Sequence, residues 1–329
     1  MIDLIRYLCI WRVNRSQGCI SAYPAVQISR ILGTIISEHL GTKEARHWRK
    51  ALKRWKNFCT RDQKEVKYYD LPSASNAPWP VEVSIVAHTS KRIYGLGEPL
   101  IWELKLFGEC ARHSFFLESI LPAMEKAGYT SISELNRNNS LWGHFDITDV
   151  YCAHGHTWEP VVQNGQLNTT YDPSPSQWIE GLSEKKGNHI YNRLIWATPF
   201  DLDNVSKAYQ EQSRNVVSLK QGLNMEYLLN AFVNRCMKLG AMSKGHAADL
   251  TDILSQEVVE ILDEAMSQSK QLPHPNSALN AAPAHMPGRW TGYQVFGPIP
   301  SIIIPFLKIA SILHLGNYTH FGCGTFYLE

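Results

Sequence analysis

Apolar residues recur along the chain with two different periods, and the change from one period to the other predicts where helices and strands lie. Residues 4–13 are rich in aromatic and β-branched side chains, which is typical of a strand. From 23 to 40, apolar residues return every three to four positions, which predicts a helix that ends at Gly41. The first half is expected to form a strand, a helix, two strands, a helix and a strand, at residues 4–13, 23–40, 81–88, 100–107, 115–127 and 143–150.

The second half is interpreted as a repeat of this order, after a loop that is expected at 154–188. Its predicted strands and helices lie at 193–199, 224–239, 250–266, 290–296, 302–313 and 325–328, with a further loop at 271–287. Two βαββαβ halves predict an α+β protein with two tandem ferredoxin-like, RRM-like domains, each an antiparallel sheet backed by helices. We expect the domains at 1–187 and 188–329, the second with a helical insertion at about 222–270.

Composition and charge exclude several classes of protein. The 329 residues suffice for two domains with cores of their own, and the net charge is only +2. No apolar run reaches membrane-spanning length, and Asp3 and Arg6 interrupt any signal-peptide core. Seven scattered cysteines without a CxxC pair indicate reduced thiols, and His154 and His156 beside Cys152 lack a fourth zinc ligand. We therefore expect a cytoplasmic protein with no metal, no cofactor and no membrane partner.

One segment is far more basic than the rest of the chain. Residues 43–67 contain ten Lys or Arg against three Asp or Glu, which leaves the remainder net acidic. A helix is expected at 43–58, with basic side chains at spacings that place several on one face. Such a face suits the phosphates of an A-form RNA stem, although it is also what a merely solvated helix would show. The candidate RNA contacts are Arg46, Arg49, Lys50, Lys53 and Arg54.

A glycine-rich loop at 316–324 lies between the last expected helix and strand. Its glycines allow the backbone to approach a ligand closely, and a run of amide N–H groups can bind an anion such as phosphate. A loop of this kind can also simply turn the chain. The residues of interest are Gly316, Asn317, His320, Gly322 and Gly324.

Several motifs together resemble the RAMP superfamily of CRISPR-associated proteins, and more closely its precursor-RNA-processing endoribonucleases. They are Leu104 to Gly108, Ile195 to Phe200, Met225 to Leu239 with Arg235, Trp290 to Pro298, and His314 to Gly324. Members often carry several cysteines after the first helix, whereas this chain has only Cys59 there. The difference suggests a divergent branch, near the type IV members with a helical insertion.

The resemblance implies a metal-independent ribonuclease, in which the ribose 2′-OH attacks the adjacent phosphate and leaves a 2′,3′-cyclic phosphate. A base, an acid and a cation are then needed, and in the family they lie on or near the first helix, facing the glycine-rich loop. Here that region offers His39, with Tyr23, Arg30 and Lys43 in support. Because some members use arginines instead, Arg30, Arg235 and Arg289 are alternatives, and Arg235 and Arg289 are also candidate RNA contacts.

The predicted function is thus binding and cleavage of the stem-loop of precursor CRISPR RNA, with the product retained at its 3′ stem. RNA and other CRISPR effector subunits are the expected partners. A second interpretation is a non-catalytic RNA-binding subunit of an effector complex. A third is an unrelated α+β enzyme whose glycine-rich loop binds a small phosphorylated ligand.

Overall fold

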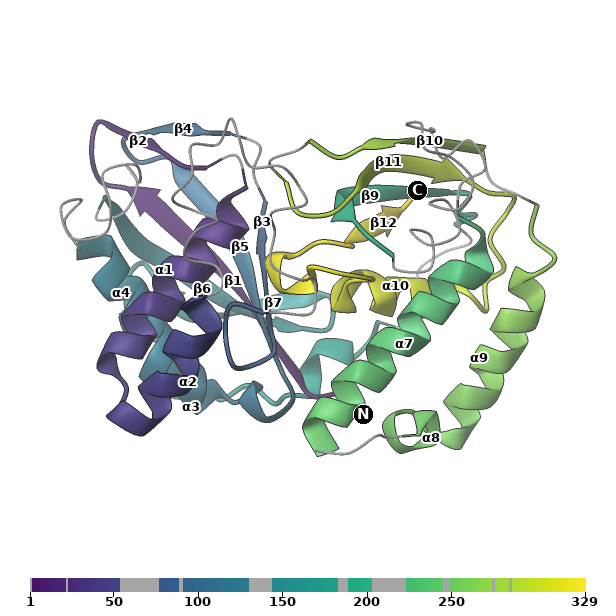
Figure 1. Cartoon of the computed structure of the whole chain (residues 1–329), viewed down its shortest axis with the longest axis horizontal. Helices are drawn as coiled ribbons and strands as arrows, with labels where there is room; N and C mark the ends of the chain where they lie inside the picture. The colour runs from purple at the N-terminus through teal and green to yellow at the C-terminus, as the bar shows by residue number, and fades with distance from the viewer. Residues whose placement is uncertain are drawn as a thin grey trace. The chain divides into compact units, whose positions relative to one another are not determined.

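The structure is a computed structural model that describes ten stretches of the chain. They are residues 2–21, 23–53, 77–88, 91–129, 144–182, 189–202, 223–244, 249–273, 276–283 and 286–329. The chain divides into two compact units, a first unit at Asp3–Glu180 and a second unit at Gly181–Glu329 with Met1–Ile2 (Figure 1). The boundary that the sequence predicts at 187 lies outside the described residues.

The first unit is built on a six-stranded sheet. Its strands are β1 (Leu4–Val13), β3 (Val83–Ala87), β5 (Pro99–Phe107), β6 (Phe145–His154), β7 (Thr157–Gln163) and β8 (Gln166–Leu167). They are antiparallel throughout and lie in the order β3-β5-β1-β6-β7-β8. Counted along the chain, the first four strands take the spatial order second, third, first and fourth, which is the ferredoxin-like arrangement. A separate two-stranded sheet pairs β2 (Gln17–Cys19) with β4 (Ile93–Gly95).

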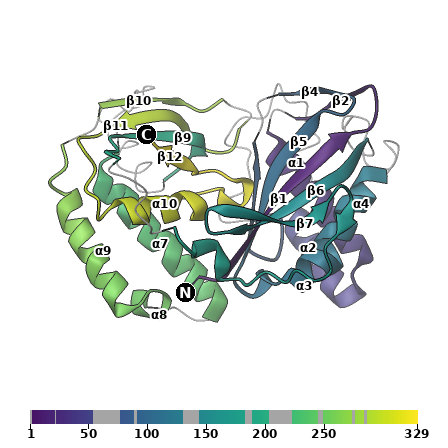
Figure 2. The same ribbon diagram turned by 180° about the vertical axis from the view of Figure 1, so that it is seen from behind.

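Helices cover one face of this sheet, as the two opposite views in Figures 1 and 2 show. They are α1 (Pro24–His39), α2 (Thr42–Lys53), α3 (His113–Phe115), a π-helical turn (Phe116–Ile120) and α4 (Leu121–Tyr129), with 3-10 turns at Gly108–Cys110 and Gln177–Ile179. The positions of α1 and α4 confirm the two predicted helices, although the second one contains the π-turn. Of the helix expected at 43–58, residues 54–58 lie outside the described part.

Aromatic side chains in the core of the first unit join its strands to one another and to the helical segment after β5. Trp11 of β1 stacks on Phe145 with ring centroids 3.9 Å apart, and Tyr7 stacks on Phe116 at 4.0 Å. All four rings are buried, so each removes a large apolar area from water. The Tyr7–Phe116 contact fixes the helical segment after β5 against the sheet, and the Trp11–Phe145 contact joins β1 to β6.

The second unit repeats the topology of the first. Its elements are β9 (Arg193–Phe200), α7 (Met225–Lys244), α8 (Leu250–Ile253), α9 (Gln256–Ser269), β10 (Asn276–Ala281), β11 (Trp290–Val295), α10 (Ile304–Leu313), a 3-10 turn (Thr319–Phe321) and β12 (Phe326–Leu328). The strands are antiparallel in the order β10-β11-β9-β12, again second, third, first and fourth. The predicted fold of two tandem ferredoxin-like units is therefore confirmed.

Two segments that the sequence predicts as loops contain strands. The expected loop at 154–188 includes β7 and β8, which extend the sheet of the first unit. Pro160 lies on β7 opposite Tyr151 of β6, next to a register shift in that pairing, and such bulges are among the places where a strand tolerates proline. The expected loop at 271–287 includes β10, a polar edge strand in which only Leu279 is buried. Pairing with β11, not local propensity, makes it a strand.

The helix predicted at 250–266 is divided in the structure. Leu254 has extended backbone angles, and the Ser255 hydroxyl then accepts a hydrogen bond from the Val258 amide at 3.4 Å to begin α9. Serine is a preferred N-cap, so this residue starts a new helix within an otherwise continuous apolar pattern. Within the described residues, no helix is long and apolar enough to cross a membrane.

Candidate functional site

Helix α1 carries three of the four predicted catalytic residues, but it does not bring them together. Tyr23 is the N-cap of α1 and His39 is its last residue. Because an α-helix rises 1.5 Å per residue, these two positions lie ~24 Å apart along the axis. Arg30 lies ~14 Å from His39 and on the opposite side of the helix. Lys43 is exposed in the first turn of α2. Within the first unit, these residues therefore do not form one cluster around His39.

His39 is held by contacts with both of its ring nitrogens. Nδ1 lies 2.7 Å from the Ile35 carbonyl oxygen. Since a carbonyl only accepts hydrogen bonds, Nδ1 carries a proton. Nε2 lies 3.5 Å from Nζ of Lys126 on α4. In a neutral imidazole that is protonated at Nδ1, Nε2 bears the lone pair, which is the arrangement that a general base requires.

A pocket of about 150 Å³ opens beside this histidine. It is lined by the end of α1, the π-helical turn and the start of α4, at Ile36, His39, Leu40, Glu118, Ser119, Pro122 and Ala123, and we call it the His39 pocket. Pockets that enclose whole small ligands measure roughly 300–1,000 Å³, so this one fits a single group of a larger ligand. π-Helical turns are frequent at functional sites, and here the turn supplies two polar side chains to the pocket.

Lys126 is the residue of this site that sequence reasoning missed. It comes from α4, 87 residues after His39, and its ammonium group also lies 3.5 Å from a carboxylate oxygen of Glu38. Its side chain is 44% exposed, so a ligand can reach it. A lysine in the last turn of a predicted helix carries no sequence signal for catalysis. The only available hint was that the two predicted helices would pack on the same face of the sheet.

Helix α2 presents the predicted basic face. It buries Ala45, Trp48 and Leu52, and the side chains of Arg46, Arg49, Lys50 and Lys53 are all exposed. Trp48 packs against Trp79, and Trp79 donates a 2.7 Å hydrogen bond to the Ser29 carbonyl of α1, so α2 is firmly held to α1. Arg54 lies outside the described residues.

The glycine-rich loop does not offer the run of free amides that the sequence suggested. The N–H groups of Asn317, Phe321, Gly322, Cys323 and Gly324 all donate to carbonyl groups of the second unit. The glycines are needed for packing, because a Cβ at Gly324 would lie 1.9 Å from the Leu315 carbonyl oxygen. These five amides thus already have carbonyl partners, in the loop itself and at Pro199 and Asp201, and Gly322 and Gly324 are buried. We therefore no longer place these two among the ligand contacts.

Two other predicted RNA contacts are buried, and a third is engaged within the second unit. Arg235 is 4% exposed, and its Nε donates to the Leu313 carbonyl at 3.0 Å, at the end of α10. His320 is 5% exposed and packs against Phe321. Arg289 lies 3.4 Å from the Asp201 carboxylate, which also accepts from Asn317 at 3.3 Å. Of these residues, only Arg289 and Asn317 keep part of their surface accessible.

The burial of Arg235 has a sequence signal that was overlooked. It lies seven residues after Leu228 and four before Leu239, on the apolar stripe of α7. A charged residue on such a stripe is oriented toward the core, where its guanidinium must find carbonyl partners.

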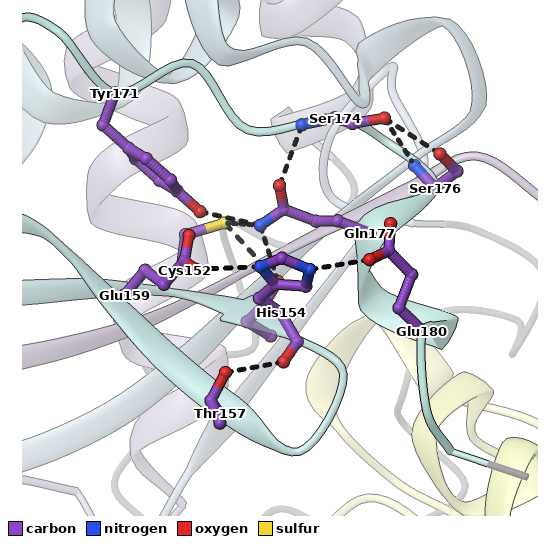
Figure 3. Close-up of polar contacts among 10 residues, drawn as sticks. Cys152, His154, Thr157, Glu159, Tyr171, Ser174, Ser176, Gln177 and Glu180 are labelled. Carbon is purple, nitrogen blue, oxygen red and sulfur yellow. Dashed lines mark hydrogen bonds and ion pairs between the residues drawn. The ribbon is translucent and has the colours of Figure 1, made fainter. Parts of the chain in front are cut away.

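A second histidine, His154, is the last residue of β6 and lies between two glutamates. Nδ1 is 2.8 Å from Glu159 and Nε2 is 2.7 Å from Glu180 (Figure 3). Because carboxylates accept, both nitrogens carry protons, and the ring is an imidazolium. The Gln177 amide completes the cluster with hydrogen bonds to Tyr171 at 2.7 Å and to the Ala153 carbonyl at 2.9 Å. The cluster fastens segment 171–180 to β6 and β7.

This geometry does not suit a metal at His154. Its two ring nitrogens point to glutamates on opposite sides, as Figure 3 shows, so these groups do not converge on one point. The described stretches contain no group of three or more His, Cys, Asp or Glu side chains that could hold a metal ion.

The His154 cluster should make the stability of the first unit depend on pH. The hydrogen bonds that His154 donates to Glu159, and then to Glu180, raise the pKa of His154 above 6.5, and the bond from His154 lowers the pKa of Glu159 below 4.5. A raised histidine pKa stabilises the fold below about pH 6.5, and this contribution is lost as pH rises through the folded pKa. The glutamate contribution is lost in acid. We expect His154→Gln to lower the free energy of unfolding by ~0.5 kcal/mol near pH 5.5 and to leave it almost unchanged at pH 8.5.

Urea unfolding of the wild type and of His154→Gln at the two pH values measures this difference in the free energy of unfolding. Glu180→Gln, which removes one of the two carboxylates, should lower the free energy of unfolding by less, with the same pH dependence. If His154→Gln lowered it equally at both pH values, a charged His154 would not be what holds the cluster together.

Comparison with known proteins now adds to these observations. No protein-family model matches this sequence, and no curated protein does either. Among solved structures, a chain of a partial Cas6-RT-Cas1–Cas2 complex matches with TM-score 0.51 at 12% identity, over 100% of this chain and 46% of that one. A Cas6-RT-Cas1–Cas2 complex gives the same TM-score and identity, over 100% and 29%. A Cas6 product complex matches with TM-score 0.46 at 11% identity, over 99% and 100%.

These matches concern the fold. The chain spans less than half the length of each of the first two solved chains. It shares its two-unit architecture with part of those two chains, both of which come from complexes named for Cas6. The resemblance that the sequence motifs indicated is thereby confirmed for the fold.

Proposed function

We propose that this chain is an endoribonuclease that binds the stem-loop of precursor CRISPR RNA and cuts it without a metal ion. The observation that carries this proposal is the pairing of His39, which lines the His39 pocket, with Lys126. The fold supports it, because the solved structures of the same architecture are named for Cas6.

The chemistry follows from the two side chains. Nε2 of His39 takes the proton of the 2′-OH, whose oxygen forms a bond to the adjacent phosphorus while the bond from phosphorus to the 5′ oxygen breaks. The products are a 2′,3′-cyclic phosphate and a 5′-OH: a water molecule gives the leaving 5′ oxygen its proton, and His39 releases the proton that it took to solvent. The ammonium of Lys126 stabilises the negative charge that develops on the phosphorane. To do so it exchanges the Glu38 carboxylate for the phosphate.

The basic face of α2 supplies the affinity for the stem. α2 begins three residues after His39, so its first turn lies at the same end of the first unit as the pocket. Each phosphate contact releases counterions, and binding should weaken steeply with salt. We propose RNA as the principal partner, with retention of the product at its 3′ stem, and other CRISPR subunits as protein partners in the cytoplasm.

A second candidate function is a non-catalytic subunit that binds processed CRISPR RNA. Two observations favour it. Tyr23 and Arg30 lie far from His39 along α1, and Glu38 already pairs with Lys126 at 3.5 Å. The closed hydrogen bonding of the glycine-rich loop argues against the third interpretation, a small phosphorylated ligand at that loop.

Cleavage of a labelled repeat stem-loop in EDTA tests the proposal. We expect one cut, which a single 2′-deoxy substitution at the cut position abolishes, because the nucleophile is then missing. Tight binding without a cut would instead establish the non-catalytic function. Absence of both binding and cleavage would contradict both candidate functions.

A further inference from the structure

The sheet of the second unit has a face that carries exposed aromatic side chains. Side chains alternate along β9, so that Trp196 is buried while Arg193 and Ile195 belong to the other face. On that face, Tyr293 of β11 is 36% exposed and Tyr327 of β12 is 52% exposed. The register places both tyrosines opposite Ile195, one from each side. The three side chains therefore form a row across three adjacent strands.

An arginine completes this row. The guanidinium carbon of Arg193 lies 4.0 Å from the ring centroid of Tyr293, within the range of a cation–π contact. One guanidinium nitrogen lies 2.8 Å from Glu329, and the arginine side chain is 35% exposed. The pairing holds the flat guanidinium group against the ring. Arginine planes and phenol rings are both surfaces on which RNA bases stack.

The row extends from the centre of the sheet to one of its edges, β12. β9 and β11 are the first and third strands of the βαββαβ unit and lie in the middle of its sheet. In RRM domains, aromatic residues on the four-stranded sheet stack two or three unpaired bases. Strands lie ~4.8 Å apart, so Tyr293 and Tyr327 are separated by ~10 Å at their Cα atoms. This separation leaves two distinct stacking surfaces.

We propose that Arg193, Tyr293 and Tyr327 form a stacking platform for unpaired nucleotides that flank the RNA stem. The proposal rests on the proposed function, since it assigns a second binding surface for the same RNA. The described part of α2 presents charge but buries its tryptophan, so it suits phosphates. The platform presents rings and a single arginine whose charge Glu329 balances, so it suits bases. Stem and flanks are thus bound by different chemistry on different units.

The test compares two fluorescently labelled RNAs, one a repeat hairpin with short unpaired extensions and the other the same hairpin without them. We expect the wild-type protein to bind the extended RNA more tightly. A double variant, Tyr293→Ala with Tyr327→Ala, should weaken binding of the extended RNA about 10- to 100-fold and leave the blunt hairpin unchanged. The corresponding double substitution by Phe should bind like the wild type, because the rings remain.

Further variants separate the possible failures. Tyr227→Ala removes a tyrosine that is 40% exposed on α7, away from the sheet, and should have no effect. Tyr327→Ala alone, on the edge strand, tests the platform if the double variant is unstable. Arg49→Gln with Lys53→Gln should weaken binding of both RNAs.

If the blunt hairpin binds and the tyrosine variants bind the extended RNA normally, the proposal of a stacking platform is wrong while the proposed function stands. If the wild type binds neither RNA, the proposed function fails.

Discussion

His39→Gln should reduce the rate of repeat cleavage about 10²- to 10⁴-fold while RNA affinity changes less than about twofold. Glutamine keeps much of the size of the imidazole and can still donate to the Ile35 carbonyl, but it has no nitrogen that can take a proton near neutral pH. The substitution therefore removes the base and little else. Single-turnover cleavage of labelled repeat RNA, with protein in excess, measures the chemical step apart from binding.

Two controls make this result specific. His156→Gln replaces an exposed histidine in the turn between β6 and β7 and should cleave at the wild-type rate. Lys126→Ala should reduce the cleavage rate roughly 10- to 100-fold. Lys126→Arg should recover part of the rate, because arginine restores the positive charge but not the geometry. Cleavage by His39→Gln at the wild-type rate would show that His39 is not the base.

Gly324→Ala should lower the free energy of unfolding of the second unit by about 3–5 kcal/mol. Gly324 has φ +83°, a left-handed conformation that alanine adopts only at a cost, and the added Cβ would lie 1.9 Å from the Leu315 carbonyl oxygen. The Leu315 amide also donates a hydrogen bond to the Gly324 carbonyl, so residues 315 and 324 cannot move apart without breaking this hydrogen bond. Thermal unfolding should show a fall of roughly 10 °C.

Gly97→Ala is the matched control for this substitution. Gly97 has φ +78°, and nothing lies within 4 Å of an added Cβ. It should cost only about 1 kcal/mol, the penalty of the left-handed backbone alone. The difference between the two variants in the free energy of unfolding then measures the steric overlap of the added Cβ at position 324 with the Leu315 carbonyl oxygen. Equal losses would mean that the loop rearranges easily, and that its close packing is not what requires glycine.

Much of the fold could be predicted because its main elements carry strong local patterns. β1 and α1 have regular apolar periods, and both lie where the sequence places them. β10 could not be found in this way, because only one of its residues is buried and its strand conformation comes from pairing with β11. The break at Leu254 was missed because apolar spacing continues across it, although Ser255 offered a capping signal.

The candidate site was less predictable than the fold. A helix pattern gives the position of His39 at the end of α1, but the partner of its ring comes from another helix 87 residues away. Sequence spacing did contain the evidence against Arg30 as a partner of His39, because nine residues at about 100° each place the two on opposite sides of the predicted helix. For Arg235, the apolar stripe of α7 did contain the answer, because a side chain on that stripe is directed into the core.

The π-helical turn at Phe116–Ile120 makes chain length, and not only composition, a determinant of the His39 pocket. A π-turn closes over one residue more than an α-turn does. Removing one residue would let the segment close as regular helix, with the residues on both sides kept in their orientation. The part of the pocket lining that Glu118 and Ser119 supply would then change, while α4 kept its packing against β6. In an alignment of chains with this fold, a single-residue gap here would mark proteins whose pocket has a different lining.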